Sequence, residues 1–132
     1  MNLLEQNATE ILLLIFLAIT FLQSGLDKVL DWKGNIAWLK GHFSETIFKN
    51  IVPFLLSIVL FMEVLVGILS IFGVYSIITK QDTTLAFYGA ILGCITLLML
   101  LLGQRIAKDY EGARTIVVYL IPTVFLIFLL QN

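Results

Sequence analysis

The stretch LSIVLFMEVLVGILSIFG, residues 56–73, decides the fold because nearly every side chain in it is apolar. About 20 such residues in a helix cross the hydrocarbon core of a bilayer. The longer apolar segment 52–78 carries one charged residue, Glu63, near the middle of the span. A carboxylate that faced lipid at that depth would be costly. We therefore predict a membrane-spanning helix whose Glu63 faces other helices, where it is either paired or protonated.

The composition of the whole chain agrees with a membrane protein. Of its 132 residues, 60% are apolar and 13% are charged, and the mean hydropathy is +1.03. A soluble domain has about 45–50% apolar and about 25% charged residues. The bilayer is the expected solvent for this excess. The net charge is −1 and no basic block occurs, so we expect no nucleic-acid partner.

Three further stretches are long and apolar enough to cross a membrane. We place the four spans at roughly 10–27, 52–78, 84–104 and 114–130, in one domain that covers residues 1–132. Helices of a soluble bundle have a polar face, whereas AILGCITLLMLLLG in the third span has none. The predicted fold is all-α, an integral membrane four-helix bundle.

A short helix at the membrane surface is expected between the first two spans. In GNIAWLKGHFSETIFK, residues 34–49, one face of a helix would carry Ile36, Leu39, Phe43 and Ile47. The charged residues between them would stay in water, and tryptophans commonly lie at this level of a membrane.

The distribution of basic residues predicts the orientation of the protein. Seven of the eight Lys and Arg residues lie in the loops that join spans one and two and spans three and four. Basic loops usually face the cytoplasm. We therefore expect a multi-pass protein whose two basic loops are cytoplasmic and whose termini are both outside.

Glu63 is the first candidate for chemistry. An acid inside a membrane is by default a proton-handling or ligand-binding group. The alternative is a protonated Glu63 that hydrogen-bonds a neighbouring helix and has only a structural role. The other spans supply no charge at its depth, so we expect Glu63 to be neutral.

A second candidate cluster ends the first span, where Gln23, Ser24, Asp27 and Lys28 follow one another at helical spacing. They are expected to line a polar cavity that Glu63 also faces, with Arg105 as a further cation at its mouth. Because Lys28 would lie at the membrane edge, a cavity is favoured over a direct salt bridge. The plainer interpretation is a helix end whose charges reach water.

Small residues predict where the helices pack closely. Gly25, Gly67, Gly89 and Gly93 are expected at helix contacts inside the bundle, although the pair in the third span also leaves dimerisation open. Cys94 is the only cysteine, which excludes an intramolecular disulfide and a Cys-x-x-Cys motif. No metal site is expected.

Three segments together resemble the DoxX family, in the broad sense that includes MauE-type proteins. The segments are FLQSGLDKVLDW at 21–32, VPFLLSIVLFMEVLVGILSIFG at 52–73 and AKDYEGA at 107–113. The resemblance covers nearly the whole chain, and the recurrent family residues that it carries over are Gly25, Lys28 and Glu63.

The resemblance implies a small four-helix protein of the bacterial cytoplasmic (inner) membrane. Some relatives are membrane subunits of quinone-linked oxidoreductases, and others take part in thiol or oxidative-stress complexes or in maturing a periplasmic redox enzyme. It therefore implies a subunit of a quinone- or thiol-linked oxidoreductase complex, with Glu63 as the catalytic residue. Quinone would be the ligand, no cofactor would be bound by the chain alone, and a partner redox protein would carry the redox centre.

Two other functions remain open. The first is a non-enzymatic membrane anchor or assembly factor that docks a partner protein. Whatever the function, the chain is expected to associate with a partner redox protein or to form a homo-oligomer. A small proton-coupled transporter ranks last, because four helices are few for that task and no inverted repeat is evident.

Overall fold

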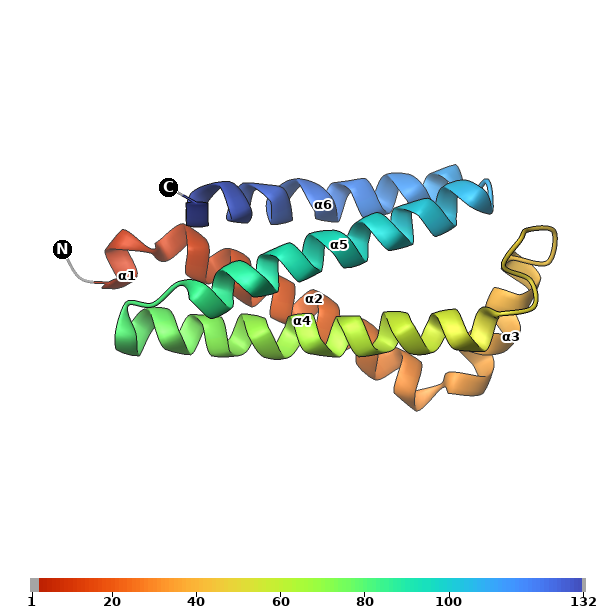
Figure 1. The fold of residues 1–132 in the computed structure, drawn as a ribbon, viewed down its shortest axis with the longest axis horizontal. Helices are drawn as coiled ribbons and strands as arrows, with labels where there is room; N and C mark the ends of the chain where they lie inside the picture. The colour runs from red at the N-terminus through yellow and green to blue at the C-terminus, as the bar shows by residue number, and fades with distance from the viewer. Residues whose placement is uncertain (1–2, 132) are drawn as a thin grey trace.

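The computed structural model describes residues 3–131, which form an all-α protein (Figure 1). Its helices are α1 Leu3–Gln6, α2 Ala8–Leu30, α3 Trp32–His42, α4 Val52–Lys80, α5 Thr84–Ile106 and α6 Tyr110–Gln131. The four helices α2, α4, α5 and α6 are long and apolar enough to cross a membrane. The predicted membrane four-helix bundle with a short helix between its first two spans is confirmed.

The long helices extend beyond the predicted apolar spans. A charged residue ends an apolar run but does not end a helix, since Lys, Arg and Glu are good helix formers. The clearest case is α6, which begins at Tyr110, before the predicted start of the fourth span. There the Asp109 carboxylate accepts a hydrogen bond from the Gly112 backbone N–H at 2.9 Å, so it caps the first turn.

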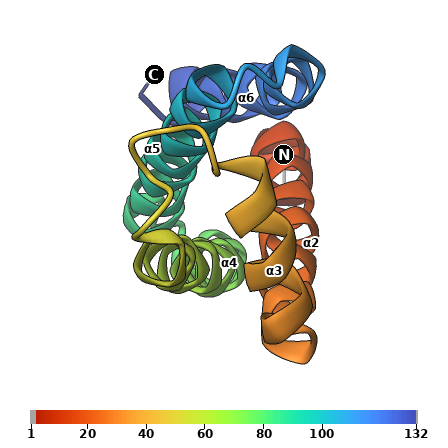
Figure 2. The same cartoon turned by 90° about the vertical axis from the view of Figure 1, so that its right-hand side faces the viewer.

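Successive long helices pack against each other. The main contacts join α2 to α4, α4 to α5 and α5 to α6, and a smaller contact closes α6 back onto α2. The helix α1 and the end of α6 lie at the same end of the bundle as the α4–α5 turn, and α3 lies at the other end with the α5–α6 turn (Figure 1). Figure 2 faces the α3 end and shows α3 beside the end of α2, followed by the segment 43–51 that returns to α4.

The change of direction from α2 to α3 occurs at Asp31. Its side chain accepts a hydrogen bond from the Gly34 backbone N–H at 3.2 Å, which caps the start of α3. Its backbone oxygen also accepts a hydrogen bond from the Asn35 side chain at 2.8 Å. These bonds end α2 early and fold α3 back beside it.

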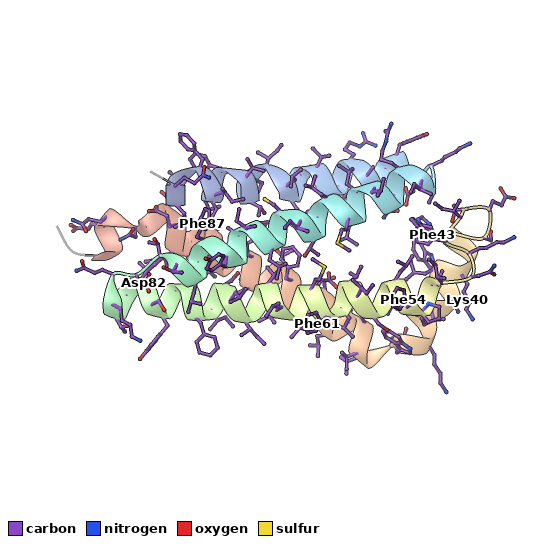
Figure 3. All side chains as sticks on the ribbon, in the orientation of Figure 1. Lys40, Phe43, Phe54, Phe61, Asp82 and Phe87 are labelled. Atoms are coloured by element: carbon purple, nitrogen blue, oxygen red, sulfur yellow. The ribbon has the colours of Figure 1, made fainter. Side chains whose placement is uncertain are left out.

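Apolar side chains cover the outside of the bundle as well as its core. Ile19, Phe61, Leu102 and Ile121, one from each long helix, are each more than half exposed. Figure 3 shows side chains that project outwards along the length of the helices, Phe61 among them. Soluble proteins rarely expose so large an apolar surface. The protein is therefore a multi-pass membrane protein whose outer surface faces lipid.

The four glycines expected at helix contacts are all buried within the bundle. Gly25 and Gly67 lie where α2 crosses α4, and Gly89 and Gly93 lie where α5 meets α4. Gly89 and Gly93 therefore serve packing inside one chain.

Gly73 lies where the backbones of α4 and α5 come close together, and it gives a stability prediction. A Cβ added there would lie 2.8 Å from the Ala86 Cα on α5, whereas a Cβ added at Gly93 would have its nearest neighbour, Val66 Cγ1, at 3.5 Å. We expect Gly73→Ala to lower the free energy of unfolding by about 1–3 kcal/mol, the usual cost of overpacking. Thermal unfolding in detergent measures this, with Gly93→Ala as the matched control. Equal losses for both variants would contradict the prediction.

Candidate functional site

The centre of the site is an ion pair between α2 and α4. Lys28 Nζ lies 2.9 Å from Glu63 Oε1, and the side chain of Glu63 is only 2% exposed. Lys28 is 17% exposed and also donates a hydrogen bond to Ser24 Oγ at 2.8 Å. An ammonium group has three donors, and Glu63, Ser24 Oγ and the Ser24 backbone oxygen, at a longer 3.4 Å, account for all three.

One carboxylate oxygen of this pair has unused hydrogen-bonding capacity. Glu63 Oε1 is buried and within ion-pair distance of Lys28, but their angles do not meet hydrogen-bond geometry. Buried polar atoms are nearly always hydrogen-bonded, because an unmet acceptor loses its solvation without compensation. Such an oxygen can still accept a proton or a hydrogen bond.

Two expectations from the sequence are wrong. A cation does reach the depth of Glu63, and Lys28 forms a direct salt bridge with it. Side chains on a helix tilt towards its N-terminus. Lys28 therefore folds back by one turn onto Ser24, deeper into the bundle. The sequence alone places Lys28 at the membrane edge because it ignores this tilt.

A second reason why Lys28 reaches the depth of Glu63 is that α2 and α4 do not end at the same level. α4 begins eleven residues before Glu63, about 16 Å at the rise of an α-helix. α2 ends only two residues after Lys28. The helix α3 occupies the end of the bundle that α2 does not reach, so the end of α2 is level with the interior of α4.

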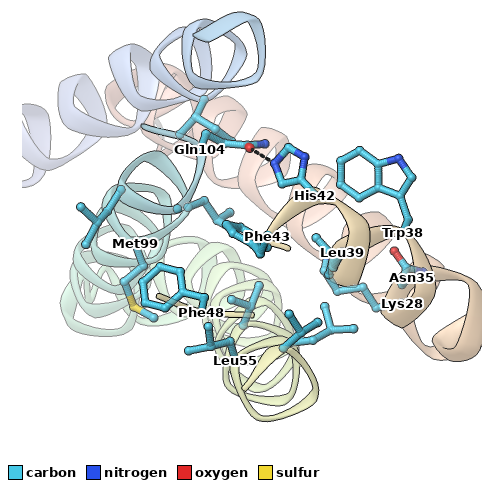
Figure 4. Close-up of a pocket in the computed structure, with 17 residues that line it drawn as sticks. Lys28, Asn35, Trp38, Leu39, His42, Phe43, Phe48, Leu55, Met99 and Gln104 are labelled. Atoms are coloured by element: carbon cyan, nitrogen blue, oxygen red, sulfur yellow. Dashed lines mark hydrogen bonds between the residues drawn. The ribbon is translucent and has the colours of Figure 1, made fainter. Parts of the chain in front are cut away.

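A cavity of about 460 Å³ opens beside this pair, at the α3 end of the bundle (Figure 4). Aliphatic side chains of α4 and α5, including Leu55, Val59 and Met99, line much of it. Small-molecule sites have volumes of about 300–1,000 Å³ and are mostly apolar with a few polar groups. The cavity therefore has the size and character of a binding site for a small amphipathic molecule.

The polar groups of the cavity come from three helices. Lys28 of α2, Asn35 and His42 of α3, and Gln104 of α5 line it. Within the described residues that line the cavity, Lys28 is the one Lys or Arg. Glu63 is not part of the lining and lies behind Lys28, one helical turn beyond Val59.

His42 ties α3 to the end of α5. His42 Nε2 lies 2.8 Å from Gln104 Oε1 and 3.8 Å from Asp109 Oδ2. Its ring stacks on Trp38, with centroids 4.5 Å apart and planes inclined by 19°. Figure 4 shows the hydrogen bond between His42 and Gln104 beside the cavity. These contacts hold α3 over the end of the bundle.

The hold of His42 on α3 leads to a prediction. His42→Ala removes the hydrogen bond to Gln104 and the stacking on Trp38, while the four long helices keep their contacts. We expect amide hydrogen exchange of residues 32–51 to become faster, by about tenfold for the loss of about 1.4 kcal/mol of local stability. Exchange within α4 and α5 serves as the internal control. Unchanged exchange in 32–51 would show that His42 does not secure α3.

The structure brings together only some of the residues expected at the cavity. Lys28 lines the cavity and Ser24 binds Lys28. Gln23 and Asp27 are exposed and hydrogen-bond each other at 2.6 Å. Arg105 is also exposed, with its guanidinium 4.7 Å from the centre of the Tyr110 ring, and does not line the cavity.

Sequence reasoning missed the contribution of α3. Asn35, Trp38 and His42 are spaced three and four residues apart, so they share a helix face. That spacing was a usable signal, but the prediction placed the apolar face of this helix against lipid, whereas Leu39 of that face lines the cavity. On α5, Gln104 lines the cavity in place of its neighbour Arg105 because adjacent residues point about 100° apart on a helix.

The described residues hold no group of three or more His, Cys, Asp or Glu side chains that could bind a metal ion. No protein-family model, curated protein or solved structure matches the chain.

Proposed function

We propose that the chain is a quinone-binding membrane subunit of an oxidoreductase complex. The observation that carries the proposal is the apolar cavity of about 460 Å³ with Lys28 in its lining and Glu63 directly behind Lys28. A quinone has a flat polar headgroup and an apolar tail, and both parts find complementary surfaces there. The resemblance to the DoxX family supports this proposal.

The aromatic side of the cavity suits a flat headgroup. Trp38, Phe43 and Phe48 line it, and aromatic side chains favour stacked or edge-on contacts with another ring. A quinone carbonyl is a hydrogen-bond acceptor, and Lys28 can donate to it in place of its 3.4 Å hydrogen bond to the Ser24 backbone oxygen. The tail would follow the aliphatic residues towards lipid.

The Lys28–Glu63 pair suits the proton chemistry of a quinone. Reduction to the quinol takes up two electrons and two protons, so a proton store beside the headgroup is useful. Glu63 would supply or accept a proton through Lys28, which touches both Glu63 and the cavity. The single cysteine means that an electron-donating dithiol would belong to a partner protein.

The proposal includes a location and an orientation. Basic residues gather at the α3 end and the α5–α6 turn, which favours the cytoplasmic side for that end. Both termini would then lie on the non-cytoplasmic side of the cytoplasmic (inner) membrane of a bacterium. The cavity would open near the leaflet that faces the cytoplasm.

Tryptophan fluorescence tests quinone binding directly, because the chain has only two tryptophans. Trp38 lines the cavity and Trp32 does not. In detergent, decylubiquinone should quench the emission of Trp32→Phe, which retains Trp38, along a saturating curve. Trp38→Phe, which retains Trp32, should show only the weak linear quenching of quinone dissolved in the micelle. Linear quenching in both variants would overturn the proposal and leave a membrane anchor as the better function.

A further inference from the structure

We propose that Glu63 sets the charge selectivity of the cavity, so that it accepts neutral amphipathic molecules and excludes those with a carboxylate headgroup. This inference rests on the proposed function in one respect, namely that the cavity binds an amphipathic ligand. It adds the chemical class of the headgroup and names the residue that determines it.

The first step concerns the charge that a ligand would meet. Lys28 supplies the only Lys or Arg group among the described residues of the cavity lining, and Glu63 lies 2.9 Å behind it. The other polar lining groups are the amides of Asn35 and Gln104 and the imidazole of His42. With a neutral imidazole, the inner end of the cavity has no net charge.

The second step concerns the cost of binding an anion there. A carboxylate that enters an apolar cavity loses its hydration, and it needs an opposite charge to compensate for that loss. The charge of Lys28 is already compensated by Glu63, and a second carboxylate beside Lys28 would be repelled by the first. A carbonyl or hydroxyl group needs only one donor of Lys28, the one that otherwise makes the 3.4 Å hydrogen bond to the Ser24 backbone oxygen.

The third step concerns what removal of the acid would do. With glutamine at position 63, Lys28 keeps its hydrogen bond to Ser24 Oγ at 2.8 Å and its place in the lining. Its charge would then be uncompensated, and a carboxylate ligand could form a charge-assisted hydrogen bond with it. The same cavity would become a site for fatty acids.

The test uses two ligands that differ only in their headgroups. In the Trp32→Phe background, 9,10-dibromostearyl alcohol and 9,10-dibromostearic acid are titrated at pH 9, where the acid is ionised, and bromine quenches Trp38. We expect the alcohol to bind about tenfold more tightly than the acid. Glu63→Gln should raise the affinity for the acid by at least about tenfold, near the lower end of what a hydrogen bond to a charged group contributes, and leave the alcohol nearly unchanged.

The double variant Lys28→Gln/Glu63→Gln separates charge from packing, because it removes both charges. It should not gain affinity for the acid. Equal binding of acid and alcohol in the background, or the same gain in the double variant, would overturn the inference. If Glu63→Gln does not fold, the comparison of the two ligands in the background decides alone.

Failure of this inference can be told apart from failure of the proposed function. If decylubiquinone quenches Trp38 along a saturating curve but the acid and alcohol bind equally, only the charge selectivity is wrong. If none of the three ligands gives saturating quenching, the cavity is not a binding site and both proposals fail.

Discussion

Lys28→Met is expected to lower the free energy of unfolding by about 3–5 kcal/mol, the cost of breaking a buried ion pair by removal of one partner. The variant leaves the carboxylate of Glu63, which is 2% exposed, without a cation. Glu63→Gln should cost less, because Lys28 is partly exposed and keeps its hydrogen bond to Ser24. Unfolding in mixed micelles with increasing sodium dodecyl sulfate measures these differences.

The double variant Lys28→Met/Glu63→Gln should recover most of the stability lost in Lys28→Met. Replacing a whole buried pair by uncharged side chains is often neutral, so the two changes should be far from additive. Lys80→Met is the matched control, since Lys80 is exposed at the end of α4, and it should change stability by less than about 0.5 kcal/mol. Additive losses in the double variant would show that the pair makes no contribution of its own.

Val59→Phe is expected to abolish quinone binding, with a loss of about 100-fold or more in affinity. Val59 lines the cavity on α4, and a phenyl ring there would occupy the space of the headgroup. Forcing extra atoms into a filled core typically costs about 1–3 kcal/mol, and a ligand that had to share this space would lose a similar or larger part of its binding free energy. Saturating quenching of Trp38 by decylubiquinone, measured in the Trp32→Phe background, gives the affinity.

The control for Val59→Phe is the same substitution on the lipid-facing surface. Val124 of α6 is about half exposed and does not line the cavity. Val124→Phe should therefore bind decylubiquinone as the background does. Undiminished binding in Val59→Phe would place the quinone elsewhere and contradict the proposed site.

The four spans could be predicted from the sequence because a bilayer leaves the backbone few alternatives to a long apolar helix. The inward direction of Glu63 followed from the same physics, since an acid in lipid is costly. The partner of Glu63 could not be predicted. The position of a residue along its own helix does not give its level beside another helix, and α2 ends well short of the start of α4.

The polar end of the cavity was also beyond the sequence pattern. Arg105 has the charge but points outwards, whereas its neighbour Gln104 faces the cavity and meets His42. Successive side chains on a helix point about 100° apart. Because helix ends inferred from hydropathy are not accurate to one residue, the sequence does not show which of two neighbours faces the cavity. The role of α3 depends on its turn at Asp31, which fixes where its side chains point.

The Lys28–Glu63 contact also fixes the axial register of two helices. Leucine, isoleucine and valine surfaces fit each other at many offsets, and lipid offers no strong preference among them. A slip of α2 along α4 by one helical turn would be about 5.4 Å, enough to separate an ion pair of 2.9 Å. A residue retained for ligand chemistry would thus also select one alignment from many of similar energy, and variants without it should populate shifted alignments of the same two helices.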